Sequence, residues 1–162
     1  MAPGETAHFR IEADTTVQQA LARRLGILSV DAAMADLAVV LSRNGRVVLS
    51  GTLKATVTQS CIVTLDPVTT EIDTAIDVLV LPPGDPGPAE ADLDMDGPDI
   101  DGHDGHSVDL GEILTQTLSL RLPDYPRVPG AAVPEGGSEP PEEEERVNPF
   151  AVLARLKENG GS

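Results

Sequence analysis

Apolar and polar residues alternate along residues 47–58, the clearest periodic pattern in the chain. A period of two places successive side chains on opposite faces of a β-strand. Asn44-Gly45 stands between this stretch and residues 35–42, and an Asn-Gly pair readily adopts the positive φ angles of a tight hairpin turn. The pattern therefore predicts a β-hairpin whose second arm turns one apolar face inward: Val47, Leu49, Leu53, Ala55 and Val57.

Further strands are predicted on either side of this hairpin. Residues 71–80 alternate between an acidic outer face and an apolar inner face formed by Ile72, Thr74, Ile76, Val78 and Val80. Residues 7–11 predict a short edge strand, and residues 61–65 an extended segment that ends at Asp66-Pro67. The strand over residues 47–58 measures about 40 Å, and Gly51 on its apolar face is the expected place for a bulge or kink.

Two helices are predicted from capping signals followed by apolar residues at helical spacing. Thr15 and Gln18 form a capping box before the first helix, and Gly26 is the expected stop. Asp109 and Glu112 form a second capping box, and Pro123 closes the helix that follows it. Antiparallel strands with segregated helices predict an α+β fold, a small curved sheet of about four strands with two helices, as a single domain over residues 1–128.

The remaining segments have compositions that do not form a core. Residues 82–106 are rich in Asp, Gly and Pro, so a disordered acidic loop is predicted there. Residues 129–145 have the Pro/Gly/Glu composition of an extended linker. Residues 146–162 contain a short helical motif, with Asn148 as its N-cap and Pro149 as its first residue. A helix of about nine residues needs a surface to dock on, and docking on its own domain and docking on a partner both fit the sequence.

Charge narrows the classes of function. The 162 residues carry 27 acidic and 11 basic side chains, a net charge of −16, and residues 82–109 contain no basic residue at all. Such a chain repels phosphate backbones, so we expect no direct nucleic-acid binding and instead a basic protein partner. No stretch is long and apolar enough for a membrane span, and no signal-peptide pattern opens the sequence, which together predict a cytoplasmic protein.

Candidate catalytic and metal-binding motifs are incomplete. Asp92-Leu93-Asp94-Met95-Asp96-Gly97 begins like a calcium loop, but His103 stands where that loop requires a bidentate Glu. His103 and His106 lack a third ligand on a rigid element, and a single cysteine excludes a disulfide framework. Cys61 has no neighbouring base and is expected to be a small buried apolar residue. These motifs favour a protein that is not an enzyme and needs no cofactor.

Four motifs, taken in order, resemble a known family. They are residues 59–67 (QSCIVTLDP), 108–114 (VDLGEIL), 122–127 (LPDYPR) and 148–157 (NPFAVLARLK). Together they are similar to the bacterial YceD family of large ribosomal RNA subunit accumulation proteins. The resemblance implies a non-enzymatic factor for accumulation of large-subunit (23S) ribosomal RNA and ribosome assembly. Some members carry paired cysteines after the long strand and again nearer the C-terminus, whereas Cys61 is alone here, so no zinc site is carried over.

Residues and resemblance together predict a factor that binds a basic ribosomal protein or assembly factor. The alternative is a generic acidic, chaperone-like module for basic clients. The contact residues expected for either function lie in the last three motifs, where apolar side chains would insert and charged ones would cap or steer: Asp109, Glu112, Tyr125, Arg127, Phe150, Leu153 and Leu156.

Overall fold

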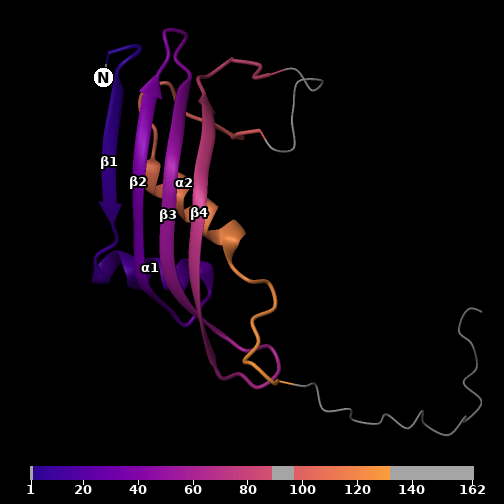
Figure 1. The fold of residues 1–162 in the computed structure, drawn as a ribbon. Helices are drawn as coiled ribbons and strands as arrows, with labels where there is room; N and C mark the ends of the chain where they lie inside the picture. Colours follow the sequence, from indigo (N-terminus) through magenta and orange to yellow (C-terminus); the bar gives the residue numbers. More distant parts are fainter. Residues whose placement is uncertain (1, 89–96, 132–162) are drawn as a thin grey trace, which may run out of the picture. The chain divides into compact units, whose positions relative to one another are not determined.

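The computed structural model describes residues 2–88 and 97–131, which form one sheet with two helices (Figure 1). The chain divides after Ala131, and the predicted linker and terminal helical motif lie almost entirely in residues 132–162, outside the described residues. In chain order the elements are β1 (Thr6–Glu12), α1 (Thr15–Leu25), β2 (Ser29–Leu41), β3 (Val47–Ser60), β4 (Pro67–Leu81), β5 (Asp99–Gly102) and α2 (Leu110–Arg121).

The sheet confirms the α+β class and corrects the expected strand count. Its order is β1-β2-β3-β4-β5, with antiparallel pairs from β1 to β4 and a parallel pair between β4 and β5. The sheet is therefore mixed and has five strands, where about four antiparallel strands were predicted. The added strand has only four residues, and Ile100 is its one apolar side chain. It is held by pairing with β4, which a local pattern does not reveal.

The acidic segment is also more ordered than its composition predicts. Residues 82–88 and 97–106 lie within the described structure, while residues 89–96 lie outside it. The carboxylate of Asp85 accepts two hydrogen bonds of 2.7 Å from the Arg46 guanidinium. Asp104 accepts from the backbone N–H groups of His106 and Ser107 at 2.8 and 2.9 Å. These carboxylates meet fixed donors, which offsets part of the entropy cost of ordering a polar loop.

The central hairpin forms as predicted. Gly45 adopts a φ of 83° in the turn, and the register pairs Leu41 with Val47. The five predicted inward residues of β3 are all buried. The expected bulge at Gly51 is wrong, because the register of β2 and β3 is continuous there and shifts instead between Val30 and Ala32.

Gly51 serves a close approach between two strands. A Cβ atom at this position would lie 2.1 Å from the carbonyl oxygen of Asp36 on β2. That oxygen belongs to the backbone, so no side-chain rotation relieves the overlap. The glycine that the sequence placed at a kink is required by strand-to-strand contact.

Residues 61–66 form a tight loop, so the predicted extended segment is wrong. The N–H of Leu65 donates to the carbonyl of Cys61, and the N–H of Cys61 donates to the carbonyl of Asp66. Leu65 has a φ of 64°, in the left-handed region. The apolar run that suggested a strand instead reverses the chain between β3 and β4.

Both helices begin at aspartate caps. Asp14 Oδ1 accepts from the N–H of Val17 at 2.9 Å, so Asp14, and not the predicted Thr15, caps α1. The predicted stop at Gly26 is confirmed by its φ of 67°. Asp109 Oδ1 accepts from the N–H of Glu112 at 3.0 Å, which confirms the second cap.

The two helices cover the same face of the sheet (Figure 1). α1 packs on β2, and α2 on β3 and β4, over a core that includes Leu49, Val57 and Leu118. In the part of the chain that the structure describes, neither helix is long and apolar enough to cross a membrane. The covered face holds the core, and a groove opens between its two helices.

Candidate partner-binding site

A groove opens between α1 and α2 where the two helices do not meet over the sheet. Its volume is about 460 Å³, within the range of known ligand sites. We call it the interhelical groove. Its floor is apolar because core-facing residues of both helices and of the strands beneath them converge there: Ile11, Leu21, Ala33, Ala35, Leu53, Leu114 and Leu118. Val17 of α1 lies at its edge.

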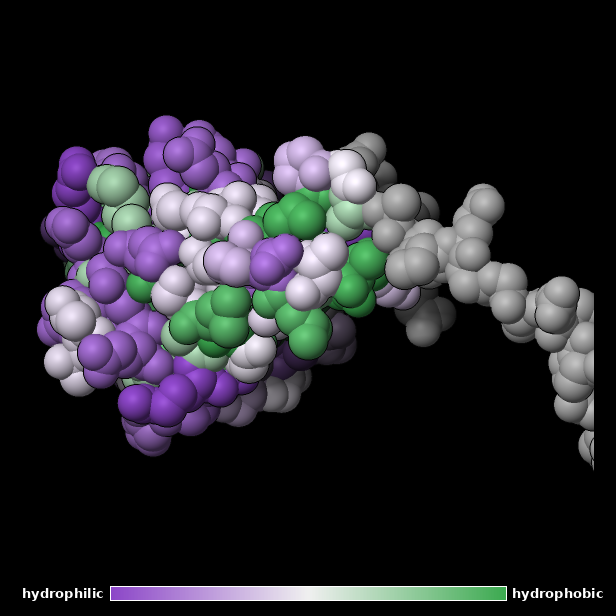
Figure 2. All heavy atoms as spheres, turned by 90° about the horizontal axis from the view of Figure 1, so that it is seen from below, coloured by the Kyte–Doolittle hydropathy of each residue, from purple (hydrophilic) through white to green (hydrophobic). Residues whose placement is uncertain are grey.

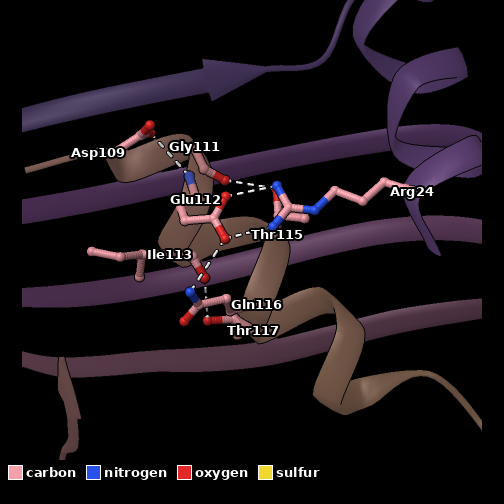
Figure 3. Close-up of polar contacts among 8 residues, drawn as sticks. All are labelled: Arg24, Asp109, Gly111, Glu112, Ile113, Thr115, Gln116 and Thr117. Atoms are coloured by element: carbon pink, nitrogen blue, oxygen red, sulfur yellow. Dashed lines mark hydrogen bonds and ion pairs between the residues drawn. The ribbon is translucent and has the colours of Figure 1, made fainter.

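The rim of the interhelical groove carries more negative than positive charge. Asp109 and Glu112 are its two carboxylates, and Arg24 is its one cation. Glu12 also lines the groove, but the register pairs it with Met34, in one row with Lys54 and Asp73, so its side chain lies on the face of the sheet that the helices leave open. Arg24 reaches from the last turn of α1 to the Glu112 carboxylate, with Nη1 and Nη2 donating at 2.6 and 2.5 Å (Figure 3). The sequence places these two residues 88 positions apart. The pair spans the gap between the helices, and with Asp109 the rim has one more carboxylate than it has cations.

The Arg24–Glu112 pair is well oriented and solvent-exposed. Gln116 Nε2 donates to Glu112 Oε1 at 3.3 Å from one turn further along α2. The hydrogen bond from Arg24 lowers the pKa of Glu112, and the same bond raises the pKa of Arg24. The Arg24 side chain is nevertheless 55% exposed and the Glu112 side chain 37%. Exposed ion pairs of this kind contribute about 0–1 kcal/mol, so this pair adds little to the stability of the fold.

The structure places the sequence-predicted contact residues in separate locations. Asp109 and Glu112 line the interhelical groove together, while each also has a structural role, as helix cap and ion-pair partner. Tyr125 and Arg127 lie in the segment after α2, outside the groove, and both are exposed. The other three predicted contacts lie outside the described residues: Phe150, Leu153 and Leu156.

Tyr125 belongs to an exposed apolar surface at the end of the sheet where β3 meets β4. The N–H of Ile62 donates to the carbonyl of buried Pro126 at 3.0 Å, which joins the 61–66 loop to the segment after α2. Leu65 and Tyr125 are 76% and 75% exposed. Figure 2, which views the molecule from this end, shows hydrophobic residues gathered between more polar margins. None of these residues lines the interhelical groove.

Cys61 lies under this end surface and is fully buried, as expected for a cysteine beside a predicted strand with no neighbouring base. Its Sγ accepts from the N–H groups of Val63 and Thr64 at 3.4 and 3.5 Å. Hydrogen bonding, chiefly from Thr64, favours the thiolate and lowers the pKa of Cys61 to about 7, against the opposing effect of burial. The sulfur organises the loop, because it accepts two of the loop's backbone donors.

The histidines have structural contacts. Nδ1 of His103 accepts from the N–H of Gly105 at 2.9 Å, which leaves Nε2 to donate to the Gly45 carbonyl at 3.2 Å. The His103 ring thereby ties the acidic segment to the hairpin turn. Within residues 2–88 and 97–131, no group of three or more His, Cys, Asp or Glu side chains is arranged to hold a metal ion. Five residues of the calcium-like motif, 92–96, lie outside the described residues.

Sequence reasoning missed Arg24 and the apolar floor as parts of one site. Arg24 carried no signal beyond its place in the last turn of a predicted helix, where cations are common. Leu21, Leu114 and Leu118 were recognised only as members of helical apolar patterns. Their convergence depends on how the two helices sit on the sheet, which neither helical pattern contains.

Comparison with known proteins assigns the family. The family model described as "Large ribosomal RNA subunit accumulation protein YceD" matches residues 49–157, more than half of the chain. No curated protein and no solved structure matches the chain. The matched range contains all four motifs that carry the resemblance, from the end of β3 to the C-terminal segment. The chain therefore belongs to the YceD family of large ribosomal RNA subunit accumulation proteins.

Proposed function

We propose that this protein supports accumulation of the large ribosomal RNA by binding a basic ribosomal protein or assembly factor, without catalysing a reaction. Membership of the family carries the ribosomal part of this proposal. The single structural observation in favour of a basic partner is the interhelical groove, an apolar recess whose rim has two carboxylates and one cation.

The charge distribution on the sheet supports the same partner chemistry. On the face that the helices leave open, β4 presents Glu71, Asp73 and Asp77, all of them exposed. The Lys54 ammonium meets Asp73 at 3.1 Å and Arg10 lies 3.9 Å from Asp36, so this face has more carboxylates than cations. Ribosomal RNA would be repelled by such a surface, whereas a basic protein gains both association rate and selectivity from it. The ribosome would therefore be reached through protein.

The experiment that tests this function combines affinity capture with subunit profiling. The tagged full-length protein is captured from lysate at low and high salt, each with and without ribonuclease. We expect to capture basic ribosomal or assembly proteins whether or not ribonuclease is added. The amount captured should fall sharply between 0.1 and 0.5 M salt, because the Debye length shortens from about 10 Å at 0.1 M and charges are screened more strongly. Sucrose gradients from cells lacking the gene should show a deficit of large subunits.

A charge-removed variant separates this function from generic binding of basic clients. Asp85 and Asp104 hold structure, so replacement is restricted to Glu90, Asp92, Asp94 and Asp96, each changed to its amide. Retained capture of the same few proteins supports a specific surface. Loss of all capture favours the generic acidic module. Recovery of RNA that persists after protein removal, or an unchanged subunit profile, would refute the proposed function.

A further inference from the structure

We propose that the interhelical groove binds a cationic amphipathic segment of a protein partner, and that an arginine or lysine of that segment displaces Arg24 from Glu112. This inference rests on the proposed function for the partner's basic character. Beyond the proposed function, it names the binding site, the chemical class of the ligand and the displacement of Arg24 that lets the ligand bind.

The groove requires both an apolar and a cationic element from its ligand. Its floor presents aliphatic side chains from α1, β3 and α2, and Val17 at its edge is 45% exposed. Burying such surface yields about 25 cal/mol per Å². Two rim carboxylates, Asp109 and Glu112, against one guanidinium leave a negative excess beside that floor. An amphipathic segment with aliphatic and cationic side chains satisfies both, as when a helix docks in an apolar groove through i, i+3 and i+4 anchors.

Arg24 acts as an internal stand-in for the ligand's cation. Its guanidinium already makes the two-pronged contact with Glu112 that a partner's arginine would make (Figure 3). Glu112 is kept in place from α2 by Gln116, so the acceptor keeps its orientation when Arg24 leaves. The exchange replaces one exposed charge pair with another. Net affinity then comes from the apolar floor and from Asp109, the other carboxylate of the rim.

The exchange makes opposite predictions for the two members of one ion pair. Removing the acceptor charge in Glu112→Gln should weaken binding about tenfold. Removing the competitor in Arg24→Gln should strengthen it several-fold, because the ligand no longer has to displace an internal cation. If the pair only held the helices together, both variants would change affinity in the same direction.

The open face of the sheet supplies matched controls. Lys54 and Asp73 form an ion pair at 3.1 Å outside the groove, with side chains more exposed than those of Arg24 and Glu112. Asp73→Asn changes the net charge as Glu112→Gln does, and Lys54→Gln as Arg24→Gln does. Neither control should change affinity by more than about twofold. A fifth variant, Val17→Ser, should weaken the binding that persists at 0.5 M salt, where the apolar contribution dominates.

The measurement uses the full-length protein and a defined probe. A labelled 14-residue peptide, with Leu at helical i, i+3, i+4 spacing and Arg on the other face, is titrated by fluorescence polarisation. A second peptide with Glu in place of Arg should not bind. Circular dichroism and thermal melting of each variant separate loss of binding from loss of fold.

Three results of the binding assay would overturn the inference. They are the same direction of change for Glu112→Gln and Arg24→Gln, an equal loss in Asp73→Asn, or no binding of the Leu/Arg peptide by the wild-type protein. A shift to a dimer in Arg24→Gln, detected by sedimentation, would assign the groove to a second copy and would likewise refute it. If the peptide fails while capture still yields basic ribosomal proteins, the groove inference falls and the proposed function stands. If the peptide binds as predicted and subunit profiles are unchanged, the groove inference stands and the proposed function falls.

Discussion

The two faces of the sheet are made from alternating residues of the same strands, yet they differ in what they contribute. On β3, Leu49, Leu53 and Val57 turn toward the helices and are almost completely buried. Their neighbours Ser50 and Lys54 turn outward and are exposed. Burying a side chain of the first kind contributes about 1.5–3 kcal/mol, and an exposed ion pair of the second kind about 0–1 kcal/mol. The covered face therefore holds the fold together, and the open face tolerates change.

The open face is not uniformly polar. Near the hairpin turn, the register places four apolar residues in one row across four strands: Val40, Val48, Leu79 and Ile100. Pairs of this kind contribute about 0.2–1 kcal/mol each through cross-strand contact. At this end of the sheet, therefore, both faces carry apolar residues. The two faces differ most in polarity at the middle of the sheet.

The largest effect expected from the comparison comes from Gly51. Gly51→Ala should lower the free energy of unfolding by more than about 4 kcal/mol, because its Cβ would overlap the Asp36 carbonyl oxygen and force two central strands apart. Urea denaturation measures the loss. Ser50→Ala, one residue along and on the open face, should change stability by less than about 0.5 kcal/mol. Similar losses for the two variants would contradict the assigned close approach.

A core truncation should have the next largest effect. Leu49→Ala removes a fully buried side chain and leaves a cavity, with an expected cost of about 3 kcal/mol. Val48→Ala, its exposed neighbour, should cost less than about 1 kcal/mol. Thermal melting of the pair tests whether burial decides the cost. Equal shifts would mean that the open face is covered in solution.

The ion pair beside the hairpin turn should give a smaller, pH-dependent effect. The Arg46 guanidinium lowers the pKa of Asp85 to about 2, from an ordinary value of 3.8. The folded-state pKa is depressed, so this contribution is present above about pH 4 and is lost as pH falls toward 2. Asp85→Asn should lower the Tm at pH 7, and the gap to the wild type should close toward pH 2. A constant gap would show that charge is not the cause. Asp77→Asn, which removes a charge from the open face, is the control.

The smallest effect is expected at the Lys54–Asp73 pair on the open face. Both side chains are largely exposed and meet at 3.1 Å. A double-mutant cycle with alanine at both positions should give a coupling energy of about 0.2–1 kcal/mol at low salt, reduced at 0.5 M salt. A coupling above about 2 kcal/mol would mean that this face is desolvated by a partner or a second copy.

Sequence patterns were reliable where a structure depends on near neighbours. The hairpin at Asn44-Gly45, the inward residues of β3 and β4 and the cap at Asp109 all follow from period two, from turn chemistry or from a side chain bonding three residues ahead. They failed where a distant backbone decides the conformation. Cys61 to Asp66 became a loop, and Asp99–Gly102 became a strand on the free edge of β4.

The candidate site divides in the same way. Asp109 and Glu112 could be chosen from the sequence because a capping box marks the start of a helix. Arg24 could not, since its contact with Glu112 joins helices that are far apart along the chain.

The sequence alone determined the acidic character, the alternating strands and the family of this protein, because charge and short-range periodicity are properties of the residues themselves. Only the tertiary structure decided that α1 and α2 share one face of the sheet, that a glycine admits a neighbouring strand, and that an apolar recess with a negative rim lies between the helices. These features arise from packing between elements, and packing depends on distances in space that residue order does not record.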